Sequence, residues 1–76
     1  MQTGSFFVGP SGTLAREFGG QRLPLKVLRS AAGYYLGTQD PEDGSPYSRE
    51  SVEYWPTEAA AAEALSTGEW NQRDHP

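Results

Sequence analysis

The chain has 76 residues, a formal net charge of −4 at pH 7 and no cysteine. This length allows one domain with a limited core, and the lack of cysteine excludes disulfide bonds and thiolate zinc sites and favours a reducing compartment. No apolar run approaches the roughly 18 residues of a membrane span, and the first residues lack the basic and long apolar segments of a secretory signal. We therefore expect a single soluble, cytoplasmic domain over 1–76.

The charges are divided unevenly along the chain. Residues 1–38 carry four basic residues and one acidic residue, a net of +3, whereas residues 39–76 carry two basic and nine acidic residues, a net of −7. Such an asymmetry can steer a charged partner toward one part of the surface. A solvated surface that carries both signs is an equally good interpretation.

The N-terminal third contains short, weak patterns. Residues 1–4 are expected to be a loose end, and residues 5–8 (SFFV) are compatible with an edge strand. The next five residues, 9–13 (GPSGT), suggest a phosphate-binding loop, but they lack the further glycine and the lysine that this chemistry requires, so they predict a turn. Residues 13–18 can form one helical turn before a Gly-Gly pair ends it.

A hairpin is predicted for the middle of the chain. Residues 23–30 lean toward β-structure, and residues 34–39 follow after a short Ala-Ala-Gly connection. A three-residue hairpin loop needs a left-handed third residue, which Gly33 supplies. This loop places Leu28 opposite Leu36 on one face, whereas a two-residue loop would shift the pairing by one residue. We prefer the three-residue loop.

An acidic loop separates this hairpin from the third predicted strand. Residues 40–46 (DPEDGSP) form a loop by every local rule. Its carboxylates raise the possibility of calcium, but an EF-hand needs differently spaced ligands between two helices, so a solvated turn is predicted. Residues 48–55 alternate loosely, with Val52 and Tyr54 on one face and Arg49, Ser51 and Glu53 on the other, as in an antiparallel sheet.

The strongest local pattern is a helix at residues 57–67. Pro56 ends the preceding strand, Thr57 is a good N-cap, and Gly68 is a usual helix stop. The predicted apolar stripe, at helical spacing, consists of Ala61, Ala62 and Leu65.

Together these elements predict an α+β fold: a three-stranded antiparallel sheet with one C-terminal helix packed on one face. Residues 5–8 would add an N-terminal edge strand. The core is predicted to centre on Leu28, Leu36 and Leu65. Residues 71–76 are expected to be a second loose end, with Trp70 packed back over the end of the helix.

No constellation of residues predicts catalysis. The single histidine, His75, is next to the last residue, so a nucleophile would lack its base. Glu50 and Glu53 could approach Asp40 or Glu42, but a domain of this size has little room for the closed pocket that raises a carboxyl pKa. We expect no enzyme activity, no cofactor and no metal ion.

The aromatic residues, which are two Trp, four Tyr and three Phe, are many for one small core. A thin sheet with one helix cannot bury all of them, so an exposed patch is expected. Surface Tyr and Trp beside arginine are typical of binding hot spots. The predicted binding residues are Arg29, Tyr35, Arg49, Glu50, Glu53, Trp55 and Glu58.

One stretch resembles a known family. Tyr35-Leu36-Gly37-Thr38 at the end of a strand, and a last strand that runs into Glu58-Ala59-Ala60-Ala61, are similar to the three-strand-plus-helix DNA-binding domains of the AP2 and phage-integrase arm type. The resemblance covers about half of the chain. It implies a sheet inserted into the DNA major groove, with contacts from Lys26, Arg29 and Arg49. The long acidic loop and the glutamates of the third strand depart from the family pattern, because they would repel phosphates.

Two function classes follow. The first is a non-catalytic protein-binding module with an acidic and aromatic surface, in its sharpest form a phage- or plasmid-type accessory or inhibitor protein that occupies a basic groove of a bacterial enzyme. That surface would be formed by Glu50, Glu53, Glu58, Glu63 and the loop at 40–43. The alternative is a DNA-binding module that uses the sheet face. The acidic balance favours the first class, and a homodimer is compatible with both.

Overall fold

The computed structural model describes residues 11–74. The predictions for residues 1–10 and for His75, including the edge strand at 5–8, lie outside this part. The elements follow the order α1 (Thr13–Gly19), β1 (Lys26–Ser30), β2 (Gly33–Gln39), β3 (Pro46–Arg49) and α2 (Glu58–Thr67). The strands form an antiparallel sheet in the order β1-β2-β3. The predicted α+β fold with a C-terminal helix is confirmed, and α1 is longer than the single turn expected.

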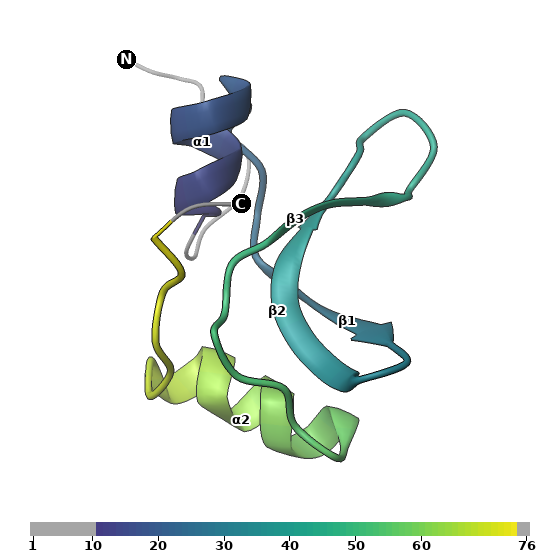
Figure 1. The fold of residues 1–76 in the computed structure, drawn as a ribbon, viewed down its shortest axis with the longest axis vertical. Coiled ribbons are helices and arrows are strands. Elements are labelled where there is room, and N and C mark those ends of the chain that lie inside the picture. The colour runs from purple at the N-terminus through teal and green to yellow at the C-terminus, as the bar shows by residue number, and fades with distance from the viewer. Residues whose placement is uncertain (1–10, 75–76) are drawn as a thin grey trace.

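The two helices lie at opposite ends of the same face of the sheet (Figure 1). α2 packs against β1 and β2, and α1 packs against β3. Side chains alternate between faces along a strand, so Tyr34, Leu36 and Thr38 share the helix-covered face, and Leu36 and Thr38 are fully buried there. Among the described residues, no helix is long and apolar enough to span a membrane.

The β1–β2 hairpin turns over two residues, so the predicted three-residue loop is wrong. Ser30 pairs with Gly33, which places Leu28 opposite Tyr35 instead of Leu36. Gly33 has a φ of 132°, in the range that favours glycine. Gly33 is the first residue of β2 and pairs with Ser30 beside the turn. A Cβ added there would lie 2.9 Å from the carbonyl oxygen of Trp55.

β3 begins and ends earlier than the predicted strand at 48–55. After Arg49 the N–H groups of Glu50 and Ser51 both donate to the carbonyl of Leu36, which interrupts regular pairing and turns the chain. Ser51 becomes fully buried while Val52 is 52% exposed. The predicted alternation, with Val52 on the covered face, is therefore wrong.

The chain after β3 pairs with the C-terminal segment. Ser51 forms an isolated β-bridge with Gln72, Val52 N–H donates to the Asn71 carbonyl at 2.8 Å, and Arg73 N–H donates to the Glu50 carbonyl at 2.8 Å. Residues 71–73 therefore differ from the loose end that was expected at 71–76. Their order comes from backbone pairing with a distant segment.

The core extends beyond the predicted centre. Of the predicted trio, Leu36 is fully buried, whereas Leu28 and Leu65 are half-buried. α2 turns Ala61 and Ala64 toward the sheet, and these small side chains let the helix backbone approach closely. Ala62, which the predicted apolar stripe included, is exposed. The buried apolar side chains are Leu14, Ala15, Leu23, Leu25, Tyr35, Leu36, Ala61 and Ala64.

Leu36→Ala is expected to lower the free energy of unfolding by about 2–5 kcal/mol, because it leaves a cavity at a fully buried site. Urea denaturation followed by circular dichroism measures this change. Val52→Ala is the control, since a side chain that is 52% exposed should change stability by less than about 0.5 kcal/mol. Equal losses in the two variants would contradict the position of the core.

Candidate functional site

The carboxylate of Glu50 is fully buried and connects three parts of the chain. Its Oε1 accepts hydrogen bonds from Leu14 N–H and from the Gln72 side-chain amide, both at 2.8 Å. Its Oε2 accepts from Ala15 N–H at 3.0 Å and from the Ser48 hydroxyl at 2.6 Å. One side chain thereby joins the first turn of α1, β3 and the C-terminal segment.

This carboxylate occupies the place where an anion would bind at the start of α1. The N-cap, Gly12, has no side chain that could accept from the first turn, so Glu50 satisfies these N–H groups from a distant part of the chain. An added Cβ at Gly12 would lie 2.5 Å from Thr38 Cγ2 and 2.7 Å from Glu50 Oε2. The N–H groups at the start of α1, where a phosphate-binding loop would hold its anion, are thus occupied by the protein's own carboxylate.

The environment of Glu50 favours its charged form. Burial raises the pKa of this carboxyl group, but the hydrogen bonds from Leu14, Ser48, Gln72 and Ala15 together lower the pKa by more, so it lies below its ordinary value. The expectation that Glu50 contributes to a carboxylate surface is therefore wrong. Its role in the described structure is to hold elements together.

Glu53 is also engaged with the C-terminal segment. Its carboxylate accepts from Asn71 N–H at 3.1 Å and from the Asn71 side-chain amide at 2.6 Å. Burial raises the pKa of Glu53, but the two hydrogen bonds from Asn71 lower it by more, to a value below the ordinary one. This predicted surface residue is half-buried.

Two predicted binding residues, Tyr35 and Arg49, lie with Tyr54 on the face of the sheet opposite to Tyr34. Arg49 donates to the Tyr54 hydroxyl, and its guanidinium lies 4.6 Å from the centre of the Tyr54 ring. Tyr35 packs edge-on against Tyr54 at 5.8 Å between ring centres. Burial and the neighbouring Tyr54 raise the pKa of Tyr35, and Arg49 opposes this. Tyr35 is only 6% exposed, so a partner would meet Arg49 and Tyr54 first.

The three cations of the DNA-binding hypothesis do not share one face. Lys26 and Arg49 both pair with Gly37, from opposite sides, so they flank it on the face that the helices leave open. Arg29 pairs with Tyr34 and points to the other face, where its guanidinium lies 5.5 Å from the Tyr34 ring centre. The register therefore separates this triad.

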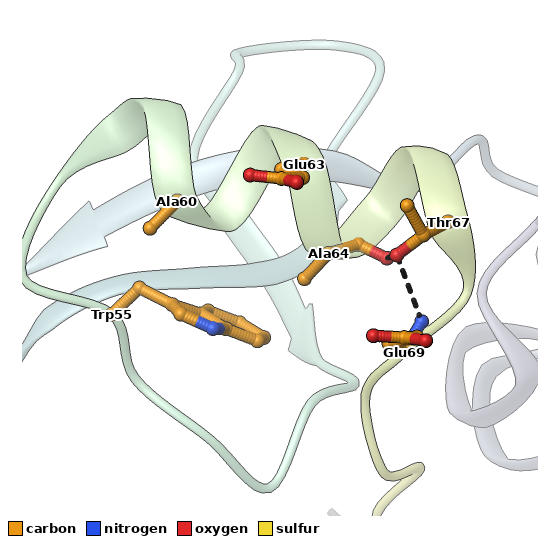
Figure 2. Close-up of a pocket in the computed structure, with 6 residues that line it drawn as sticks. All are labelled: Trp55, Ala60, Glu63, Ala64, Thr67 and Glu69. Carbon is orange, nitrogen blue, oxygen red and sulfur yellow. Dashed lines mark hydrogen bonds between the residues drawn. The ribbon is translucent and has the colours of Figure 1, made fainter.

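Trp55 and α2 enclose a hollow of about 230 Å³, which we call the Trp55 hollow. Figure 2 shows the indole beneath the helix, with Ala60 and Ala64 above it and Glu69 beyond its far end. The residues that line it are Trp55, Ala60, Glu63, Ala64, Thr67 and Glu69. A half-buried aromatic ring, small apolar side chains and two carboxylates thus meet at one place.

Hydrogen bonds fix the two sides of the Trp55 hollow. Trp55 exchanges two hydrogen bonds with Tyr34, at 2.9 and 2.7 Å, which fixes the indole at the end of the sheet. Thr57 caps α2 by accepting from Ala60 N–H at 3.1 Å, and the left-handed Gly68 ends the helix. After the helix, Glu69 lies beside Thr67, because its backbone N–H donates to the Thr67 hydroxyl at 3.3 Å.

Sequence reasoning found Trp55 but not its partners at this hollow. Positions 60, 63, 64 and 67 have the i, i+3, i+4, i+7 spacing of one helix face, and this pattern could have indicated Glu63 and Thr67. Glu69 follows the helix stop and could be placed only by the fold. Glu58 is exposed in the first turn of α2 and does not line the hollow.

Two other hollows are less suited to a defined ligand. One, of about 180 Å³, lies between α1 and β3 beside Phe18, which is 61% exposed, and Tyr47, which is 38% exposed. No charged side chain from residues 11–74 lines it. The other, of about 320 Å³, is lined by both Lys26 and Asp40, whose opposite charges favour no one kind of ion.

In the part of the chain that the structure describes, no group of three or more His, Asp or Glu side chains could hold a metal ion. No protein-family model, curated protein or solved structure matches the chain. The resemblance to AP2 and phage-integrase arm domains stays a prediction.

Glu50→Gln is expected to lower the free energy of unfolding by about 2–3 kcal/mol, because an amide can accept at only one of its two heavy atoms and leaves buried N–H groups unsatisfied. Chemical denaturation at pH 7 measures the loss. Glu42→Gln, at an exposed loop position, is the matched control and should be nearly neutral. An equally stable Glu50→Gln protein would contradict the role of this carboxylate.

Stability should also depend on pH through Glu50. Because its folded pKa is lowered, its contribution is fully present above the ordinary pKa of 4.5 and is lost as the pH falls through the lower folded value. Denaturation midpoints measured from pH 7 down to the acid transition should fall less steeply in Glu50→Gln than in the parent. Parallel pH profiles would show that Glu50 titrates normally.

Proposed function

We propose that this protein is a small, non-catalytic protein-binding module whose partner is basic and binds the acidic surface of α2 around the Trp55 hollow. The observation that carries this proposal is the charge of one segment. Residues 50–72 contain five glutamates and no lysine, arginine or histidine. Two of the five, Glu50 and Glu53, are engaged in hydrogen bonds that hold the fold together.

The remaining three glutamates are exposed and lie on α2 or just after it. Glu58 is in the first turn of the helix, and Glu63 and Glu69 line the Trp55 hollow. Carboxylates beside a partly exposed aromatic ring combine electrostatic steering with a contact surface of the kind that anchors interfaces. We define the acidic surface as Glu58, Glu63 and Glu69.

The acidic loop at 40–43 is a separate feature. Figure 1 shows the β2–β3 loop far from α2, at the other end of the sheet. Asp40 accepts from Glu42 N–H at 2.8 Å, and Asp43 accepts from Ser45 N–H at 2.9 Å and from its hydroxyl at 2.7 Å. The two hydrogen bonds from Ser45 lower the pKa of Asp43. The loop carboxylates thus stabilise their own turn, which supports a partner surface centred on α2 instead.

A stoichiometric accessory or inhibitor protein of the phage or plasmid type is the more specific form of this proposal. An acidic, partly aromatic helix face is complementary to a basic groove, and nucleic-acid-binding sites on other proteins are grooves of that kind. Occupation of such a groove requires binding alone and no catalytic residue. DNA binding through Lys26 and Arg49 on the open face is the competing outcome.

Neutralising the acidic surface should abolish partner binding. We expect the variant Glu58→Gln/Glu63→Gln/Glu69→Gln to lose a protein that the parent captures from bacterial lysate in a salt-dependent manner. The control variant Glu17→Gln/Glu42→Gln/Asp74→Asn makes the same change in net charge at exposed positions away from α2 and should retain that protein. Quantitative mass spectrometry of the captured proteins measures both.

Two results would contradict this function. The first is equal capture by the acidic-surface variant and the control variant, which would place the binding site elsewhere. The second is a salt-sensitive electrophoretic shift of DNA fragments by the purified protein that is lost on changing Lys26 or Arg49 to Gln. That result would favour the DNA-binding alternative.

A further inference from the structure

We propose that the Trp55 hollow receives the side chain of an arginine in a basic segment of the partner. This inference rests on the proposed function and names the chemical group that the site recognises. The walls of the hollow, the negative charge around it and the positions of the protein's own arginines support it.

The walls of the hollow suit a long side chain with a planar cationic end. The indole of Trp55 forms one side, and the small Ala60 and Ala64 leave room above it (Figure 2). These apolar surfaces can cover the alkyl stem of an arginine or lysine, which buries its methylene groups while its charged end stays near polar atoms. The carboxylates of Glu63 and Glu69 complete the lining.

Three independent features make the hollow attractive to a cation. Glu63 and Glu69 contribute two negative charges. Thr67 and Glu69 lie at the C-terminal end of α2, the negative end of the helix dipole, and the last turn has no basic residue to offset it. The face of an indole ring is the best of the aromatic surfaces for a cation–π contact. An anionic ligand would be repelled by all three.

The protein's own arginines do not fill this position. Among the described residues, Arg29 lies over Tyr34 and Arg49 lies over Tyr54, so two tyrosines already have intramolecular cation–π partners. In the part of the chain that the structure describes, no basic residue lines the Trp55 hollow. The same contact can be made there by an arginine from another chain.

Arginine fits the hollow better than lysine does. Its planar guanidinium can stack on the indole and still donate in its own plane to carboxylates at the rim, and it is more weakly hydrated than an ammonium group. An ammonium group can approach the ring but cannot stack on it or donate two parallel hydrogen bonds. We therefore expect arginine to bind more tightly than lysine.

The test uses the full chain labelled with ¹⁵N and follows the indole N–H signals of its two tryptophans. Capped arginine (N-acetyl-arginine methylamide) should shift the Trp55 indole signal saturably, with a Kd on the order of 1 mM for one side chain. Trp70 does not line the hollow and serves as the internal reference. Capped citrulline, which has the same shape without the charge, should cause no saturable shift, and capped lysine should bind more weakly.

Three variants locate the site. Glu63→Gln and Glu69→Gln should each weaken arginine binding about two- to fivefold, the range for an exposed ion pair, while Glu42→Gln changes nothing. Ala60→Leu should abolish binding because it fills the hollow without changing the charge. Its unchanged thermal unfolding and amide spectrum would show that the fold persists; if it does not fold, the two glutamate variants decide.

Each outcome supports or overturns the inference. Equal shifts with citrulline, tighter binding of lysine, or arginine binding that is insensitive to Glu63→Gln and Glu69→Gln would overturn it. If the acidic-surface variant loses its protein partner but arginine causes no shift at Trp55, the proposed function stands and this inference fails. If arginine binds as described while partner capture does not depend on the acidic surface, the proposed function fails and the arginine site stands.

Discussion

Four hydrogen bonds converge on the buried carboxylate of Glu50, and the arrangement of the C-terminal half depends on them. They come from the start of α1, from β3 and from the C-terminal segment. A charged group without these donors would be costly to bury. The carboxylate therefore caps the start of α1 and ties it to β3 and to Gln72 of the C-terminal segment, which also pairs by backbone with residues 50–52.

This use of Glu50 divides the glutamates of the C-terminal half into two groups. Glu50 and Glu53 accept hydrogen bonds within the fold, and their pKa values are lowered for that reason. The acidic surface stays in solvent on or beside α2, where no basic residue of residues 50–72 can neutralise it. A surface with one sign of charge and an aromatic hollow attracts a partner of the opposite sign.

The aromatic residues are divided in a similar way. Tyr34 and Tyr54 each have an arginine of the same chain over the ring, and Tyr35 is buried under Tyr54. Trp55 differs because the backbone holds its indole beside two alanines and two glutamates. Its position follows from its pairing with Tyr34 at the end of the sheet, which brings a strand-end residue against the following helix.

Local chemistry determined the fold class and the C-terminal helix. Pro56, Thr57 and Gly68 act within a few residues of themselves, so the helix predicted at 57–67 is found at Glu58–Thr67 with the expected N-cap. The tertiary structure alone decided the hairpin register, the burial of Glu50 and the lining of the Trp55 hollow. The hairpin register follows from the two-residue turn at 31–32. The burial of Glu50 depends on contacts between distant residues, such as the bond between Leu14 and Glu50 across 36 positions, which the sequence neighbours of neither residue specify.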